Sequence, residues 1–263
     1  MSNIVPTDNK ENRQPYILEE TGDFAVVFKP PRMHCVTGKQ VCHKQKTDES
    51  LEEWYMRSFP EILEHGGALV HRLDFETQGL VLFAKNKESF EYFHSLQEGG
   101  GFIKEYSAVC LKNVCSKSDN KFPGYPSPPV FTGPPFVIES FFRPFGPGRK
   151  QVRPAIDEKY KEIAKDRDDY YKTEVISAKE NIFTLRIKRG FRHQIRCHLS
   201  WIGFPIQNDP LYGTNPALPE TGFLALRAQA LFFTDPQSRL KREYRITSLE
   251  NTPFFVSQEG YGH

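Results

Sequence analysis

The sequence is poor in cysteine and has no surplus of either charge. Its five cysteines form an odd and sparse set, which a disulfide framework would not produce, so we expect free thiols in a reducing compartment. His34, Cys35, Cys42 and His43 lack the paired C-x2-C spacing of structural zinc sites, and no metal is expected. The 35 basic and 33 acidic side chains give a net charge of +2. Any basic surface must therefore be a local patch.

Long apolar runs are also missing. No stretch reaches the length that crosses a bilayer, and the first residues are polar, without the hydrophobic core of a signal peptide. We therefore expect a cytoplasmic protein without membrane partners, with a flexible tail over residues 1–15. The sequence also has no G-x-S-x-G, Walker lysine, H-E-x-x-H or G-x-G-x-x-G motif, which argues against a nucleotide cofactor or a catalytic metal.

What the sequence does contain is a set of strand and helix patterns without regular alternation. Strands are expected at 24–29, 80–84, 103–110 and 183–189, and helices after Asp48, after Asn86 and after Gly190. Residues 122–147 are dense in proline and glycine, which indicates a long loop with strand pieces near 136–142, and 157–169 is a mixed-charge run that we expect to be solvated. These patterns predict an α+β fold on a large mixed or antiparallel sheet.

The tetrapeptide His71-Arg72-Leu73-Asp74 stands just before the apolar 80–84 strand. A carboxylate beside an arginine and a histidine at a strand edge is held charged and aimed, as a nucleophile or base must be. The alternative is a surface aspartate in a turn, paired with Arg72. The tetrapeptide by itself favours that alternative.

Two segments carry a local excess of positive charge. The first, 186–198, holds several arginines and lysines and no acid, and the second is 142–153. Basic side chains on a strand and at the start of the next helix suit phosphate oxygens, so a polyanionic partner is expected. A solvated face balanced by acids elsewhere is the alternative.

Several separated motifs together resemble the RluA-type pseudouridine synthase family. They are Val70-His71-Arg72-Leu73-Asp74 with Thr77-Gln78-Gly79-Leu80, Lys104-Glu105-Tyr106-Ser107-Ala108, Gly190-Phe191-Arg192-His193-Gln194-Ile195-Arg196-Cys197-His198-Leu199, Gly203-Phe204-Pro205-Ile206 with Asp209, and Leu226-Arg227-Ala228. The resemblance covers about 17–236. The chain departs from the family pattern at Gln78, Phe191 and Arg227.

The resemblance implies a pseudouridine synthase fold, in which a large, mostly antiparallel sheet with flanking helices and loops surrounds a central cleft. Residues 16–263 would then form a single catalytic domain with a Pro-rich insertion near 119–150 and no S4 domain. The implied reaction is isomerisation of specific uridines to pseudouridine in structured ribosomal or transfer RNA, without a cofactor, by a protein that we expect to be a monomer.

The resemblance also implies roles for individual residues. Asp74 would be the essential carboxylate, attacking C1′ or abstracting the 2′ proton, and Arg196 would pair with it. The uridine base would first flip out of its stack in the RNA. Tyr106 would then stack on the uracil and could take part in proton removal from C5. The remaining expected contacts are Arg72, Lys104, Lys188, Arg192, His193 and Gln194 for RNA, and Leu224 and Leu226 for the uracil pocket.

Two other functions remain open from the sequence. One is a catalytically silent RNA-binding or RNA-folding protein with the same fold, which would bind RNA with a steep salt dependence and isomerise no uridine. The other is an enzyme for a small phosphorylated molecule, which would use the 186–196 patch and gain little from RNA length.

Overall fold

The computed structural model describes residues 14–37, 49–59, 69–111, 125–156, 170–213 and 222–246. The expected N-terminal tail, apart from its last two residues, lies outside these ranges, as do the mixed-charge run 157–169, Asp48, Cys42 and Cys115. Cys35, Cys110 and Cys197 are free and buried.

The described residues form one ten-stranded sheet in the order β1-β2-β3-β9-β4-β8-β7-β5-β6, with β10 also paired to β9. The β3–β9 pair is parallel and the other described pairs are antiparallel, so the expected mixed, mostly antiparallel sheet is confirmed. The strands are β1 (Tyr16–Glu20), β2 (Phe24–Lys29), β3 (Gln78–Ala84), β4 (Ile103–Val109), β5 (Phe136–Phe145), β6 (Gln151–Ala155), β7 (Tyr171–Lys179), β8 (Ile182–Ile187), β9 (Leu226–Thr234) and β10 (Lys241–Arg245).

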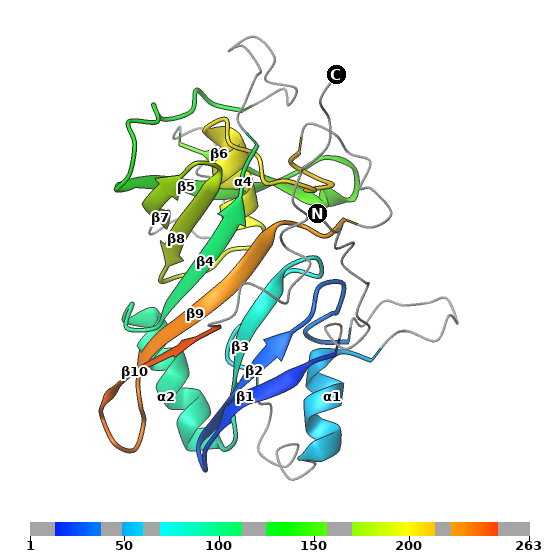
Figure 1. Ribbon diagram of the computed structural model, residues 1–263, viewed down its shortest axis with the longest axis vertical. Helices are drawn as coiled ribbons and strands as arrows, with labels where there is room; N and C mark the ends of the chain where they lie inside the picture. Colours follow the sequence, from blue (N-terminus) through cyan, green and yellow to red (C-terminus); the bar gives the residue numbers. More distant parts are fainter. Residues whose placement is uncertain are drawn as a thin grey trace, which may run out of the picture.

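Helices cover both ends of this sheet. α1 (Leu51–Ser58) and α2 (Lys87–Glu98) lie at the end that holds β1 to β3, and α4 (Gln194–Trp201) lies at the end that holds β5 to β8 (Figure 1). The long strands β4 and β9 run side by side across the middle. None of the helices in the described ranges is long and apolar enough to cross a membrane.

Strands β2 and β3 are buried along their whole length. Because successive side chains point to opposite faces, Val27 and Phe83 pack with Tyr55 of α1, whereas Val26 and Leu82 pack with Phe93 of α2. This two-sided burial explains why both strands read as continuous apolar runs rather than as alternating ones.

The start of α1 differs from the expectation. Ser50, rather than Asp48, is the N-cap, and its hydroxyl accepts a hydrogen bond from the Glu53 backbone N–H at 3.2 Å. The Glu53 carboxylate accepts the Ser50 backbone N–H at 2.9 Å, which completes a capping box. The reciprocal Ser-x-x-Glu pair therefore decides where the helix begins. At α2 the expected cap is confirmed, because the Asn86 side chain accepts from the Ser89 N–H.

The later part of the Pro-rich segment contains a longer strand than expected. Where strand pieces were predicted near 136–142, β5 continues to Phe145. Its first half, 136–140, pairs with β7, and its second half, 141–145, pairs with β6. No short-range sequence pattern predicts this change of partner. The partner strand supplies the hydrogen bonds that a proline-containing segment would otherwise lack. The short 3-10 helix η3 (Pro147–Arg149) closes the β5–β6 turn.

Candidate active site

A cavity of about 450 Å³ opens between the loop before β3, the faces of β4 and β9, and the start of α4. Because β3 and β9 are parallel, with Gln78 opposite Arg227, the loop that precedes β3 and the first residue of β9 lie at the same end of the sheet. The cavity brings together most of the site residues expected from the sequence: Arg72, Asp74, Lys104, Tyr106, Arg192, His193, Gln194, Arg196 and Leu226.

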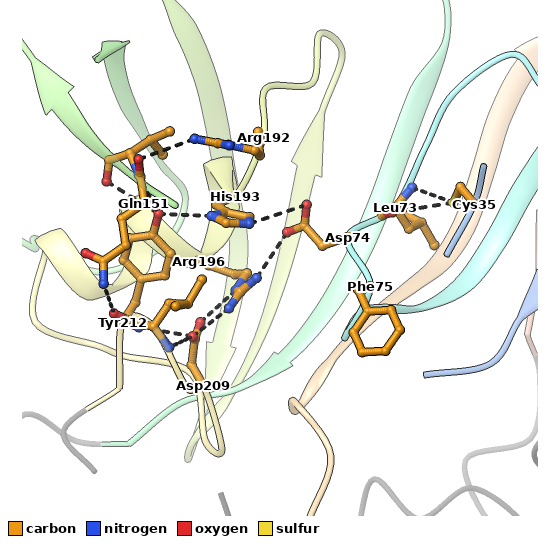
Figure 2. A network of polar contacts seen from close by, with 12 residues as sticks. Cys35, Leu73, Asp74, Phe75, Gln151, Arg192, His193, Arg196, Asp209 and Tyr212 are labelled. Atoms are coloured by element: carbon orange, nitrogen blue, oxygen red, sulfur yellow. Dashed lines mark hydrogen bonds and ion pairs between the residues drawn. The ribbon is translucent and has the colours of Figure 1, made fainter. Parts of the chain in front are cut away.

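The residues directly before and after Asp74 are both held by hydrogen bonds that their backbone groups make. The Cys35 thiol accepts a hydrogen bond from the Leu73 N–H at 3.2 Å and faces the Leu73 carbonyl oxygen at 3.4 Å (Figure 2). The buried Lys29 ammonium donates to the Phe75 carbonyl at 3.2 Å, and also to the carbonyls of Pro30 and Met33. The backbone on each side of Asp74 is therefore tied to the segment that follows β2.

The Asp74 carboxylate faces two side chains of the α4 region (Figure 2). Its Oδ2 lies 3.4 Å from Nη1 of Arg196, and its Oδ1 lies 4.0 Å from Nε2 of His193. The Asp74 side chain is 23 % exposed. It is thus fixed by basic groups on one side while part of it still faces the cavity.

Arg196 is itself held by Asp209, whose part the sequence reading missed. Nε and Nη2 of Arg196 each donate to a different Asp209 oxygen at 2.8 Å, and both side chains are buried. Burial by itself lowers the pKa of Arg196, but the Asp209 hydrogen bonds and the charges of Asp209 and Asp74 outweigh burial and raise this pKa above its usual range. A stable cation therefore presents Nη1 to Asp74.

His193 was expected to bind RNA, but its ring lies inside the site. It is 12 % exposed, and its Nδ1 is 3.2 Å from the Tyr212 hydroxyl. Burial lowers the pKa of His193, with Arg196 and Arg192 acting in the same direction and Asp74 opposing. His193 also has a left-handed backbone at the N-cap of α4, with φ 57°. That turn directs its ring toward Asp74.

Tyr106 and Leu226 share the cavity, as expected, because they lie diagonally across the β4–β9 pair, where Leu226 is opposite Ala108. Leu224 is fully buried in the core and does not line the cavity, so its expected place in the uracil pocket is wrong. Burial raises the pKa of Tyr106 above its usual range, and the Asp74 charge adds to this. The phenol is therefore protonated at neutral pH.

The groups expected to contact RNA fall into two sets. Arg72, Lys188 and Arg192 are exposed, and Lys188 lies outside the cavity lining. Lys104 is buried, at 3 % exposure. Gln194 is also buried, and its amide donates to the Lys172 carbonyl and the Thr173 hydroxyl, so both of its N–H groups are used inside the protein.

Not all of the charge in 186–198 is available to a ligand. Arg186 pairs with Glu105 at 2.8 Å, whereas Arg192 donates to the Arg149 carbonyl at 2.7 Å and keeps its charge. The local excess of arginine in the sequence is therefore partly neutralised by Glu105, which lies on the neighbouring strand. Within the described ranges, no group of three or more His, Cys, Asp or Glu side chains is placed to hold a metal ion.

Comparison with known proteins identifies the family of this fold and cavity. Residues 23–201 match the family described as RNA pseudouridylate synthase. The chain belongs to this family. Members of the RNA pseudouridylate synthase family are isomerases that act on RNA.

Individual members of the RNA pseudouridylate synthase family are distant relatives. The chain is 26 % identical to the tRNA pseudouridine synthase C of Haemophilus ducreyi, with 86 % of this chain and 87 % of that protein covered. It is 27 % identical to the ribosomal large subunit pseudouridine synthase C of Rickettsia felis, with 84 % and 63 % covered. Against three curated relatives, the chain spans 39 % to 67 % of their length.

A solved structure shares the fold. The human RNA pseudouridylate synthase domain containing 1 superposes with a TM-score of 0.61 at 18 % identity, covering 90 % of this chain and 84 % of that one. The expected pseudouridine synthase fold is thereby confirmed.

Proposed function

We propose that this protein isomerises uridine to pseudouridine in structured RNA, with Asp74 as the essential carboxylate. The observation that carries the proposal is the position of Asp74. Its carboxylate is bracketed by Arg196 and His193, is partly open to the cavity, and shares that cavity with Tyr106. A carboxylate fixed by charge-assisted contacts beside an aromatic face suits attack on a sugar carbon that carries a flat base.

The reaction needs no co-reactant, because substrate and product are isomers. The bond between N1 and C1′ breaks, the uracil turns, and a bond forms between C5 and C1′, after which C5 loses its proton and N1 gains one. Asp74 would serve either by attacking C1′ or by removing the 2′ proton. Both routes place the same carboxylate against the ribose.

Tyr106 would provide the surface on which the uracil lies, with Leu226 beside it. Since its pKa is raised, Tyr106 enters the reaction as a phenol that can donate a hydrogen bond, rather than as a resident phenolate base. Removal of the C5 proton through this hydroxyl would require the phenol to give up its own proton in the same step.

The substrate base must leave its stack to reach Asp74, at a cost of a few kcal/mol. Arg72, which is exposed and lies two residues before Asp74, would enter the vacated space, and exposed Lys188 and Arg192 would meet phosphates. The names of the relatives from Rickettsia and Haemophilus favour ribosomal or transfer RNA as the substrate.

The first prediction is that Asp74→Asn abolishes turnover and leaves RNA affinity within a few-fold, because the substitution removes the reacting charge but preserves shape. The measurement is tritium release from RNA that carries [5-³H]uridine and comes from cells lacking the gene, combined with filter binding. Glu139→Gln, which neutralises an exposed carboxylate on β5, is the matched control and should release tritium normally.

Two results would reject parts of this proposal. Tritium release by the Asp74→Asn protein would remove Asp74 from the chemistry. No release by the wild type, together with RNA binding that weakens steeply with salt, would instead identify a catalytically silent RNA-binding protein.

A further inference from the structure

The cavity lining includes two buried hydrogen-bond donors that the proposed chemistry at Asp74 does not use. They are Lys104, on β4, and His71, three residues before Asp74. Lys104 is 3 % exposed and His71 is 8 % exposed. Both residues line the same cavity as Asp74, so a ligand that fills the cavity meets them.

Lys104 is a buried amine with little compensation. Its Nζ donates to the Lys188 carbonyl at 3.0 Å and lies 5.1 Å from the centre of the Phe102 ring, and no carboxylate within the described ranges lies at ion-pair distance from it. Burial accordingly lowers its pKa to about 8. A buried ammonium is normally paired with an anion, because removal from water is costly. This one retains N–H groups for a partner that the protein does not supply.

His71 contributes a neutral donor beside Lys104. Its Nε2 accepts the Leu82 N–H at 3.3 Å, which puts the ring proton on Nδ1. Nδ1 is buried and has no hydrogen-bond partner in the described part of the chain. Burial lowers the pKa of His71 well below its usual value, and the Lys104 charge adds to this. A buried donor without a partner in a cavity wall calls for an acceptor from a ligand.

The position of Lys104 relative to Tyr106 indicates which acceptor this is. The two residues lie on the same side of β4 and both line the cavity. Positions two apart on a strand are separated by about 6.6 Å. Because uracil and ribose are uncharged at neutral pH, the phosphate is the part of a nucleotide that can supply a counter-charge to Lys104 at this distance from the base.

Resting on the proposed function, we infer that Lys104 and His71 form a subsite for an RNA phosphate that flanks the flipped uridine. The phosphate supplies the missing counter-charge for Lys104 and an acceptor oxygen for the Nδ1–H of His71. Lys188, whose carbonyl accepts the Lys104 hydrogen bond, is exposed and lies outside the cavity lining. Recognition at this subsite would depend on the phosphate of the nucleotide and not on the identity of its base.

The test compares the binding of uridine, uridine 3′-monophosphate, uridine 5′-monophosphate and inorganic phosphate to the full-length protein by NMR titration. For wild type, one of the monophosphates should bind at least about tenfold more tightly than uridine, as expected for charge-assisted hydrogen bonds. Lys104→Met should remove that preference while uridine affinity stays within a few-fold. Lys179→Met, which removes an exposed lysine at the end of β7, is the matched control and should keep the preference.

A second measurement does not depend on a variant. Raising the pH from 7 to 8.8 should reduce the wild-type preference for the monophosphate, because Lys104 loses most of its charge while the phosphate stays close to fully ionised. An equal preference in wild type and Lys104→Met, or no preference in wild type at pH 7, would overturn the subsite. Inorganic phosphate that binds as tightly as the nucleotide would make it a site for free anions. Tritium release by the wild type tests the proposed function independently of all these outcomes.

Discussion

At the scale of single residues, the Asp74 carboxylate depends on groups far away in the chain. Arg196, which contacts it, is 122 positions away in sequence and is itself fixed by buried Asp209. Asp209 also accepts the backbone N–H groups of Leu211 and Tyr212, so it shapes the turn as well as the ion pair. The orientation of the Asp74 carboxylate therefore depends on Asp209, a side chain that makes no contact with it.

Asp209→Asn should lower kcat at least about tenfold and destabilise the protein by about 3 kcal/mol, since removing one charge of a buried pair leaves the other uncompensated. Tritium release and urea unfolding measure the two effects. Glu243→Gln, at an exposed pair with Arg245, is the control and should change stability by less than about 1 kcal/mol. A wild-type kcat for the Asp209→Asn protein would show that turnover does not depend on the ion pair between Asp209 and Arg196.

Tyr106→Phe should retain RNA affinity and lose most turnover. The substitution preserves the ring on which we propose that the base stacks. It removes a hydroxyl that makes no hydrogen bond within the described ranges and that would face the substrate in the cavity. Single-turnover tritium release at saturating RNA is the measurement. Turnover close to wild type would reduce Tyr106 to a stacking surface.

At the scale of elements, the loop before β3 is shaped by its attachment to the segment after β2. The two strands are antiparallel neighbours, with Lys29 opposite Gly79, so the end of β2 lies beside the start of β3. Gly79 has φ 128°, and a Cβ there would overlap the Ala228 backbone, so only glycine lets β3 and β9 approach this closely. Cys35 and Lys29 then tie the loop at both sides of Asp74.

Cys35→Ala should lower the free energy of unfolding by about 1–3 kcal/mol and reduce kcat with unchanged RNA affinity, because the Leu73 N–H loses its acceptor. Cys35→Ser should recover much of kcat, since a hydroxyl can both accept and donate. Urea unfolding, tritium release and filter binding separate these effects.

Cys110→Ala is the matched control, because Cys110 is a buried thiol that does not line the cavity. It should cost stability without lowering kcat. If both alanine variants lowered kcat equally, the role of Cys35 would be general packing.

At the scale of the whole molecule, several histidines are buried in neutral form. His198 lies between the Ser140 and Thr173 hydroxyls at 3.0 and 2.9 Å, and burial lowers its pKa to about 3. His71 and His193 are shifted in the same direction. The unfolded chain therefore binds more protons than the folded one below the ordinary histidine pKa of about 6.5.

Stability should therefore fall as the pH is lowered from 6.5 to 5, and His198 should contribute up to about 1.4 kcal/mol per pH unit. The measurement is the free energy of urea unfolding at several pH values in this window. His198→Gln, which can still bond Ser140 and Thr173, should flatten the slope. His94→Gln, at an exposed position on α2, should leave the slope unchanged, and equal slopes for wild type and His198→Gln would contradict the neutral burial of His198.

The sequence by itself determined the strands β2, β3, β4 and β8, the cap of α2 and the family motifs, because these depend on neighbours within a few positions. Only the tertiary structure decided that β6 pairs with the second half of β5, that Lys104 and Gln194 are buried, and that the His193 ring points toward Asp74. Each of these is set by a partner that is remote in sequence and supplies a hydrogen bond, a charge or a covering surface. Side-chain alternation can say that Lys104 and Tyr106 share a face, but only the packed sheet shows that this face is the wall of a cavity.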